Sequence, residues 1–416
     1  MNALYSGVSS ANRVLYQFEN STIEMNGKEN YIAELKVARA FYYYLLLEAF
    51  GNVPIIDRFD VPDGYLPATE PRSKVFEFVE SELKNNINNL SEDVLNTYGR
   101  FNKWNAKMLL ARLYLNAEAW IGTPMYNECE NLCNEIIATN KYRLDGDYSL
   151  PFSTNNELSN ETMFVIPFDE TKSGGQIYMW ARKTLHYSQM QTFNLQATWL
   201  DGGCVGVPTF FDNYIEGDKR LEKTWRMGQQ YALDGTPLWT NGWCGDPQML
   251  LSYTKDVTNI SGDATMYQGY RFGKYEIKIG ATGTPDNDYV IMRYAEVLMM
   301  KAECILRTGG SSQEAAELVN EVRRRNFDTT NELTGSELEA TIIYNGVPVK
   351  YGRFLQELGV EFALEGLRRS QLIRFDNNFT KGTWWEHQPT NDTKRNLMLI
   401  PFDQLQRNSN LVQNPK

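Results

Sequence analysis

The apolar residues in the first third of the chain recur every three or four positions, which is the spacing of amphipathic helices. The first long pattern stops at Gly51, and glycine commonly follows the last turn of a helix. A loop rich in Pro and Gly comes next, over residues 52–71, before the spacing resumes. The pattern predicts helices over residues 29–50, 73–90, 102–120 and 125–140.

The same spacing returns near residue 290 and predicts helices over residues 290–308, 311–326 and 351–371. In the segments 102–140 and 290–326, two helices follow one another across a short Gly-containing turn. Small residues stand where the two helices must approach closely: Ala106, Ala111, Ala295 and Ala302. Recurring helix pairs of about 34 residues are typical of tetratricopeptide-like repeats. We therefore expect a mainly α fold built on a tetratricopeptide-like helical-repeat scaffold.

The helical spacing fades in the middle of the chain. Five of the nine tryptophans and half of the 30 glycines fall between residues 170 and 290, and short extended runs such as 162–167 appear. Glycines favour turns, and loops on a rigid scaffold are where binding residues gather. We expect one structural unit with an N-terminal helical part (1–140), an irregular, loop-rich and ligand-presenting insert with a few short strands (141–288), and a C-terminal helical part with a tail (289–416).

The charge and composition exclude several classes of protein. The chain has 416 residues with 41 Lys and Arg against 52 Asp and Glu, so its formal net charge is −11. Such an acidic chain lacks the basic surface of a nucleic-acid-binding protein, and we expect no nucleic-acid partner. The sequence contains no run of 18 apolar residues, so it predicts no transmembrane helix. Only two histidines are present, His186 and His387, which leaves almost no material for a histidine-based metal or catalytic site.

The residues with reactive side chains form no recognisable catalytic motif. The five cysteines are scattered and complete no zinc set, so we expect buried thiols. Asp212, Glu216 and Asp218 predict a solvated acidic turn, and the charged residues of 323–325 and 361–369 predict structural ion pairs. We expect no cofactor, although this turn or the Asn- and Glu-rich segment 155–161 could supply oxygen ligands for a structural calcium ion.

Aromatic residues make up 13% of the chain, and many lie in the glycine-rich middle. An exposed indole or phenol ring can stack on the flat C–H face of a sugar, while amides and carboxylates around it bind the hydroxyl groups. The candidates for such a carbohydrate site are Trp199, Trp180, Trp239, Trp243 and Tyr267, with Asn194 and Asp201 at the edge. The alternative is that each ring fills a minor core under the long loops.

Four stretches resemble the SusD/RagB family of surface lipoproteins from Gram-negative bacteria. They are VARAFYYYLLLEAFGNVPII (37–56), RFNKWNAKMLLARLYLNAEAW (100–120), MRYAEVLMMKAECILRTGG (292–310), and EFALEGLRRSQLIRF (361–375) with LIPFDQLQRNSNLVQNP (399–415). They span nearly the whole chain in the family's order. The resemblance implies non-catalytic capture of glycans at the cell surface. It also implies a lipid-anchored lid over a SusC-like TonB-dependent transporter in the outer membrane.

The sequence departs from the family's pattern at its start. Family members begin with a lipoprotein signal, a lipid-bearing Cys and a further stretch of polypeptide, and none of these precedes Met1 here. We therefore expect a truncated chain that lacks its anchor and part of the sugar site. The family often has a ligand-stacking Trp ahead of an aromatic helix start, and Trp199, upstream of Phe210 and Phe211, matches it best.

Three other functions stay open. A peptide-binding, RagB-like uptake protein would offer polar groups that pair with a backbone instead of stacked Trp rings. A glycoside hydrolase would need two carboxylates that face each other across a cleft, and no such pair stands out. A cytoplasmic helical-repeat adaptor would explain the missing signal but not the Trp-rich insert.

Overall fold

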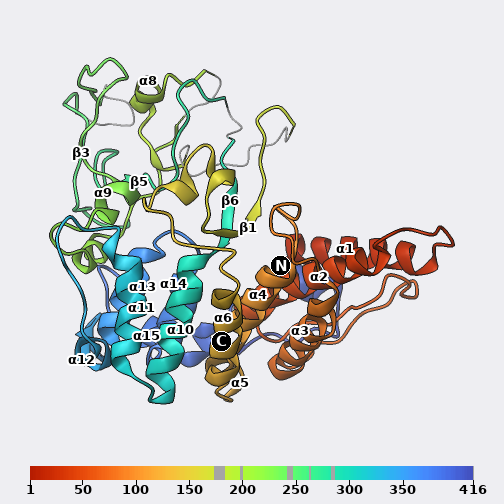
Figure 1. Cartoon of the computed structure of the whole chain (residues 1–416). Coiled ribbons are helices and arrows are strands. Elements are labelled where there is room, and N and C mark those ends of the chain that lie inside the picture. The colour runs from red at the N-terminus through yellow and green to blue at the C-terminus, as the bar shows by residue number, and fades with distance from the viewer. Residues whose placement is uncertain (173–182, 197–199, 241–246, 262–263, 283–285, 416) are drawn as a thin grey trace.

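In the computed structural model, helices from both ends of the chain form one part of the molecule and the middle of the chain forms a second, loop-rich part (Figure 1). The structure describes residues 1–172, 183–196, 200–240, 247–261, 264–282 and 286–415. The loop-rich part, called the insert below, lies above the helices in the view of Figure 1. A short two-stranded sheet joins the two parts, with β1 (Thr162–Ile166) antiparallel to β6 (Tyr289–Arg293).

The helical part is a row of helices that pack side by side. Its N-terminal helices are α1 (Asn2–Asn20), α2 (Lys28–Ala49), α3 (Arg72–Asn86), α4 (Lys103–Leu115), α5 (Ala117–Ile121) and α6 (Tyr126–Ala138). Its C-terminal helices are α10 (Tyr294–Thr308), α11 (Ser312–Arg324), α12 (Gly335–Glu339), α13 (Gly352–Glu361), α14 (Arg368–Arg374), α15 (Asn378–Lys381) and α16 (Phe402–Arg407). Helix α6 packs against both α4 and α10 and so joins the two halves, while α10 packs against α11. The predicted mainly α, repeat-like scaffold is confirmed.

One continuous hydrophobic cluster runs through both halves of the helical part. It includes buried side chains from four different helices: Val37, Leu109, Leu298 and Phe354. The alanines of the two predicted helix pairs are also buried in it, as close helix packing requires. Burial of apolar surface, at about 25 cal/mol per Å², therefore dominates the stability of this part. Within the described ranges, no helix combines the length and the apolar character needed to cross a lipid bilayer.

Two of the predicted helices differ clearly from the structure, one at its start and one in its middle. Residues 290–293 are not helical, because they belong to β6 and pair with β1, more than 120 residues earlier. The predicted helix 351–371 is interrupted between α13 and α14, where Leu364 and Gly366 have φ angles of 67° and 78°. Residues in the left-handed region end a helix, and apolar spacing alone does not reveal them.

The insert contains short elements and small clusters. Its strands β2 (Trp225–Arg226) and β5 (Arg271–Phe272) form one antiparallel pair, and β3 (Gly228–Gln229) and β4 (Ser252–Tyr253) form another. The α-helices among its described residues are α8 (Met190–Phe193) and α9 (Arg220–Thr224). A further hairpin, β7 (Thr341–Tyr344) with β8 (Val347–Lys350), lies in the C-terminal part. The insert's apolar side chains form several small clusters instead of one core, which confirms the expected irregular, loop-rich middle.

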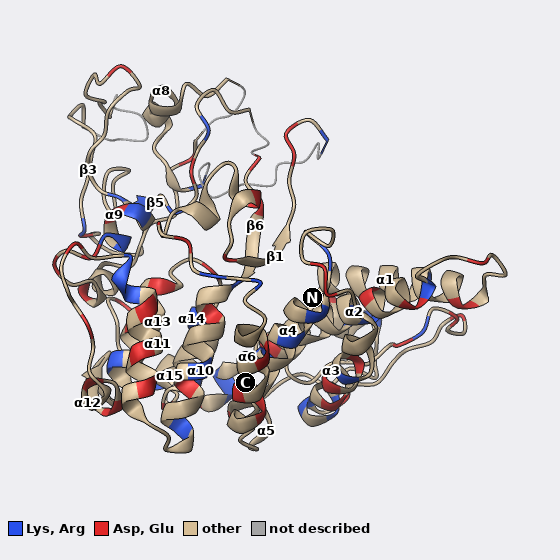
Figure 2. Cartoon of the chain, viewed as in Figure 1, with Lys and Arg blue, Asp and Glu red and all other residues tan. Residues whose placement is uncertain are grey.

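A buried group of ion pairs, called the seam below, fastens the insert to the C-terminal helices. Its members are Glu161, Asp218, Arg220, Lys274, Arg293, Arg323, Arg325, Glu357, Glu361 and Glu365. Glu361 lies at its centre, with carboxylate oxygens 2.9 Å from the guanidinium nitrogens of Arg220, Arg293 and Arg325. Figure 2 shows the acidic and basic stretches next to one another around α9 and α13.

The seam confirms one prediction from the sequence and corrects another. The arginines of residues 323–325 do form structural ion pairs, with Arg323 bound to Glu357. The expected solvated turn is wrong at Asp218, which is buried and lies 2.7 Å from Arg220. Burial alone would raise the pKa of Glu361, but the surrounding guanidinium groups hold it far below its usual range.

Candidate functional site

Three extended segments of the insert, residues 228–233, 236–240 and 249–253, are joined by backbone hydrogen bonds. The N–H of Leu238 donates to the carbonyl oxygen of Gln230 at 2.9 Å, and the N–H of Leu251 donates to that of Leu238 at 2.8 Å. A turn at Gly235, with φ of 86°, connects the first two segments. The three segments therefore form a small, fixed surface.

Exposed and buried side chains alternate along these segments, as expected for strands with one face in water. Leu238 and Leu251 point into a small buried cluster. On the other face, Trp239 is 51% exposed, Tyr231 48% and Leu250 42%, and these three residues are called the platform below. Trp239 and Leu250 lie directly opposite each other on neighbouring segments. Large apolar side chains gathered on one wet face are typical of a binding surface.

Buried hydrogen bonds hold the backbone beneath the platform. The side-chain amide of Gln189 donates to the side-chain oxygen of Gln230 at 2.9 Å, and the hydroxyl group of Tyr253 donates to Gln189. The hydroxyl group of Ser188 donates to the carbonyl oxygen of Trp239 at 2.8 Å. A backbone fixed in this way leaves less freedom to be lost when a ligand stacks on the ring.

His186 belongs to this supporting layer. Its imidazole is buried, and its Nδ1 accepts a hydrogen bond from the N–H of Ser188 at 3.1 Å. Burial, aided by the positive charge of Arg271, lowers the pKa of His186 to about 4. The imidazole is therefore neutral at neutral pH and acts as a hydrogen-bond acceptor under the platform.

The structure describes four of the seven site residues predicted from the sequence. Trp239 lies on the platform, and the half-buried Tyr267 packs against the small cluster of Leu238 and Leu251 beneath it. Asn194 is exposed at the end of α8, which is bound to the first segment through a hydrogen bond from Thr192. Three predicted residues thus fall in one region of the insert.

Of the remaining four predicted site residues, one lies away from the platform and three are not described by the structure. Asp201 forms an ion pair with Lys183, with an Nζ to Oδ2 distance of 2.6 Å, outside the three segments of the platform. Trp180, Trp199 and Trp243 lie outside the described residues, so their part in a site stays a prediction.

Two platform residues, Tyr231 and Leu250, were not expected from the sequence. The run QYAL (230–233) directly before the turn at Gly235 holds one polar and three apolar residues, so it lacks the alternation that would have predicted a strand with one exposed face. The core alternative holds for Trp225, which is buried with its ring edge-on to Phe211 at 5.0 Å between centroids.

Two of the residues considered for calcium, Asn156 and Glu161, serve the fold. In the part of the chain that the structure describes, no group of three or more His, Cys, Asp or Glu side chains could hold a metal ion. The amide of Asn156 donates to the backbone of Pro151 and Asp288, and Glu161 pairs with Arg293 in the seam. These oxygen-bearing side chains already have partners.

The cysteines follow the expectation in part. Cys129, Cys133 and Cys304 are buried free thiols, as predicted, whereas Cys204 is free but exposed. Burial raises the pKa of the Cys129 thiol, so it stays protonated and packs as a small apolar group.

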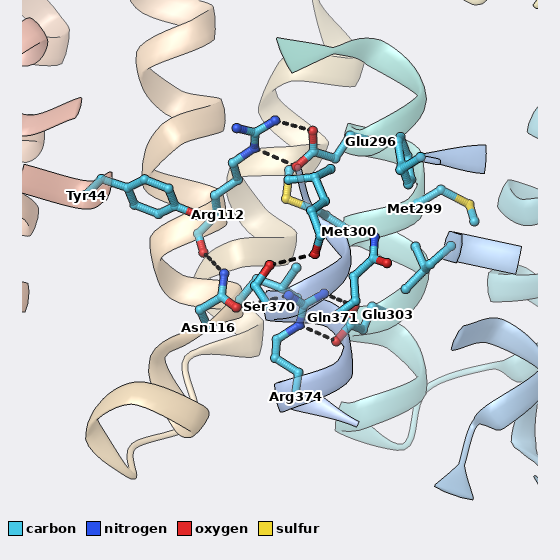
Figure 3. Close-up of a pocket in the computed structure, with 14 residues that line it drawn as sticks. Tyr44, Arg112, Asn116, Glu296, Met299, Met300, Glu303, Ser370, Gln371 and Arg374 are labelled. Carbon is cyan, nitrogen blue, oxygen red and sulfur yellow. Dashed lines mark hydrogen bonds and ion pairs between the residues drawn. The ribbon is translucent and has the colours of Figure 1, made fainter. Parts of the chain in front are cut away.

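A small cavity lies among the helices of the scaffold, between α4, α10 and α14 (Figure 3). Its volume is about 20 Å³, room for about one water molecule. The charged groups around it bind one another: Arg112 pairs with Glu296, and Arg374 pairs with Glu303 with a nitrogen to oxygen distance of 2.9 Å. This cavity is a packing feature and is too small for a sugar.

Comparison with known proteins places these features in a family. Residues 134–416 match the SusD family, and residues 1–115 match a family described as "Starch-binding associating with outer membrane". The starch-binding protein SusD of Bacteroides thetaiotaomicron is 26% identical over 429 residues, covering 92% of this chain and 72% of that protein. A SusD-like protein of Bacteroides ovatus is 32% identical over 418 residues, covering 93% of this chain and 65% of that one.

A solved structure shares the fold. Surface glycan-binding protein A from Bacteroides thetaiotaomicron, in complex with laminarihexaose, superposes with a TM-score of 0.73 at 21% identity. The superposition covers 99% of this chain and 84% of that chain. The family match over residues 134–416 covers more than half of the sequence, and this chain therefore belongs to the SusD family.

Proposed function

We propose that this chain binds oligosaccharides at the cell surface without cleaving them and delivers them to a SusC-like TonB-dependent transporter. The observation that carries the proposal is the platform, two half-exposed aromatic rings on a backbone held from below, in a member of this family. One relative is named a starch-binding protein, and a structural neighbour was solved with laminarihexaose. Both names concern glucans, so glucan oligosaccharides are the first ligands to test.

The insert, residues 141–288, presents the ligand in this proposal. The ring of Trp239 stacks on the C–H face of a sugar, and Tyr267 supports it from beneath. The exposed amide of Asn194 binds hydroxyl groups at the edge, and the carboxylate of Asp201, which pairs with Lys183 outside the platform, is a candidate for a further contact. Trp180, Trp199 and Trp243 are further candidates for the aromatic surface.

The proposed location is the outer membrane, with the chain facing outward. The description of the family that matches residues 1–115 supports an association with the outer membrane. A lipid anchor and a transporter beneath the chain follow from the family resemblance. The contact with the transporter should bury roughly 1,600 Å² or more, as stable protein–protein interfaces do. Co-purification of the lipidated protein from membranes should recover a large β-barrel protein, and its consistent absence would contradict this part.

Titration calorimetry with maltohexaose, laminarihexaose and a pool of short peptides tests the binding function. We expect saturable binding to at least one oligosaccharide and no increase in reducing ends after prolonged incubation. Binding to peptides alone would favour the RagB-like alternative. Sustained release of reducing ends, abolished by one Asp or Glu substitution, would instead identify a glycoside hydrolase.

A further inference from the structure

A second pocket, called the Arg368 pocket below, lies where the insert meets the C-terminal helices. Its volume is about 390 Å³, within the range of about 300–1,000 Å³ that is typical of small-molecule sites. The insert side is the turn of 3-10 helix over Pro208–Asn213 together with Trp225, and the other side is formed by α13, α14 and α15. None of the three platform residues lines it, so it is a separate place on the molecule.

The walls of the Arg368 pocket combine flat rings with a few polar groups. Five aromatic side chains line it: Phe210, Trp225, Tyr344, Phe379 and Trp384. The ring of Trp384 is held in place by stacking on His387, with 3.8 Å between centroids. Thr209 and Asn345 add a hydroxyl group and an amide to the lining. Apolar faces with a few polar groups at the edge suit a sugar ring.

The guanidinium group of Arg368 supplies a positive charge to this pocket. Its Nη1 donates to the carbonyl oxygen of Leu355 at 2.9 Å and to the side-chain oxygen of Gln371 at 3.2 Å, and its Nη2 donates to the hydroxyl group of Tyr344. All three partners are neutral. These bonds occupy three of the five N–H donors, and the Nε–H and one Nη2–H are left for a further acceptor.

Arg368 differs in this respect from the arginines of the seam. Arg220, Arg293 and Arg325 bind carboxylates of the seam. Arg369, which also lines the pocket, donates to the backbone carbonyl oxygens of Glu48 at 3.4 Å and of Asn396, and burial lowers its pKa although the negative charge of Glu48 partly offsets this. Within the described ranges, no ion pair joins Arg368 to a carboxylate. A guanidinium group keeps its charge in proteins, so one unit of positive charge is left without an acidic partner in a chain whose net charge is −11.

The helix behind Arg368 is shaped to receive it. A Cβ atom at Gly359 of α13 would lie only 2.9 Å from the Cζ atom of Arg368 and 3.0 Å from its Nη1. The glycine is not required by its own backbone, because Gly359 lies within α13 and has no positive φ. Its lack of a side chain provides the space in which the guanidinium group lies flat against the helix.

We infer that the Arg368 pocket binds an acidic sugar residue, one that carries a carboxylate or a sulfate group, as a subsite separate from the platform. This inference rests on the proposed capture of oligosaccharides and adds a chemical class of ligand to it. The rings contact the apolar faces of the sugar, and the remaining N–H donors of Arg368 bind its anionic group. Charge-assisted bonds of this kind are about twice as strong as neutral ones.

Calorimetric titration of the full chain tests the inference with three probes. The probes are a galacturonic acid tetrasaccharide, its neutral methyl ester and a sulfated galactan tetrasaccharide, with maltohexaose as a platform ligand. In the wild type we expect the acidic probes to bind at least 10-fold more tightly than the ester and to weaken as salt is added. Arg368→Gln should weaken the acidic probes at least 10-fold and leave maltohexaose unchanged. The anionic group is identified by which probe loses affinity in Arg368→Gln: the carboxylate probe, the sulfate probe or both.

A second variant covers the case in which Arg368→Gln does not fold. Val205 is 37% exposed at the pocket, and Val205→Glu places a negative charge there. It should also weaken the acidic probes at least 10-fold, whereas the same change at the exposed Val412, which does not line the pocket, should have no effect. Equal affinity of the acidic probes for wild type and both pocket variants would overturn the inference. Binding of maltohexaose without any acidic probe would also overturn it, whereas failure of every oligosaccharide to bind would refute the proposed function itself.

Discussion

The helical scaffold and the insert reach a fixed structure by different physical means. The scaffold buries one continuous hydrophobic cluster that extends through most of its helices. Among its described residues, the insert has clusters of three to five buried residues, each supported by partly buried neighbours. Its loops are held by buried hydrogen bonds under the platform and by the ion pairs of the seam. The comparison indicates that apolar burial supports the scaffold, while polar contacts position the platform.

The strongest test of this comparison is the removal of one charge from the seam. In Glu361→Gln, the guanidinium groups of Arg220, Arg293 and Arg325 lose a shared carboxylate in a buried place. Breaking a buried ion pair from one side costs about 3–5 kcal/mol, so the free energy of unfolding should fall by that amount. Urea denaturation measures it.

A matched control uses the same chemical change on the surface. Glu317 pairs with Arg324 at 2.7 Å, but both side chains are well exposed. Glu317→Gln should cost less than about 1 kcal/mol, as exposed ion pairs do. If the two variants lost equal stability, the seam would not be the fastening described here.

Truncating one leucine in each region sharpens the same comparison. Leu47 of α2 lies in the large cluster, and Leu47→Ala should lower the free energy of unfolding by about 2–5 kcal/mol without changing the affinity for a platform ligand. Leu251 lies in the small cluster beneath the platform. Leu251→Ala should cost less stability but should weaken ligand binding, because the support of Trp239 is loosened. Urea denaturation measures the stability of both variants and calorimetry measures their affinity. A loss of affinity in Leu47→Ala but not in Leu251→Ala would contradict the comparison.

The comparison also explains what the sequence could predict. In the scaffold, helix-spaced apolar residues and a glycine after the first long helix predicted the elements, because the information is local. The predicted start of the helix at residue 290 was wrong, because residues 290–293 pair with a strand from another part of the chain. The burial of Asp218 was missed for a similar reason, since its neighbour Arg220 also binds Glu357 and Glu361 from α13.

The candidate site was less predictable than the fold. Composition and family resemblance predicted that aromatic rings of the insert form the site, and the ring of Trp239 is indeed exposed. Which rings are exposed depends on the pairing of short segments, such as Trp239 with Leu250, and on buried amides such as Gln189. Neither the pairing of these short segments nor the burial of these amides follows from a periodic pattern in the sequence.

A change of pH should weaken the insert through His186. The pKa of this buried imidazole is about 4, below the ordinary value of about 6.5, so the unfolded chain takes up a proton first as the pH falls. Its contribution to stability is therefore present above pH 6.5 and is lost as the pH falls from 6.5 towards 4. By pH 5 the loss should reach about 2 kcal/mol. Urea denaturation at pH 7.5 and 5.0 measures the difference.

A variant isolates the contribution of the histidine. His186→Asn keeps a hydrogen-bond acceptor for the N–H of Ser188 but has no group that titrates in this range. The difference in stability between pH 7.5 and 5.0 should shrink by about 2 kcal/mol in this variant. An unchanged difference would assign the pH dependence to other groups.

We expect the insert to hold an exposed ring that stacks on a saccharide. Measuring both the ligand affinity and the melting temperature of Trp239→Ala tests this most directly. A stacking residue at the centre of a site contributes about 2 kcal/mol to binding, so the affinity for the best oligosaccharide should fall roughly 30-fold. The melting temperature should stay unchanged, because the ring is half exposed, and Phe402→Ala, at an exposed ring of α16 in the helical part, should change neither quantity. A large drop in melting temperature with unchanged affinity would contradict the account and assign Trp239 to the core.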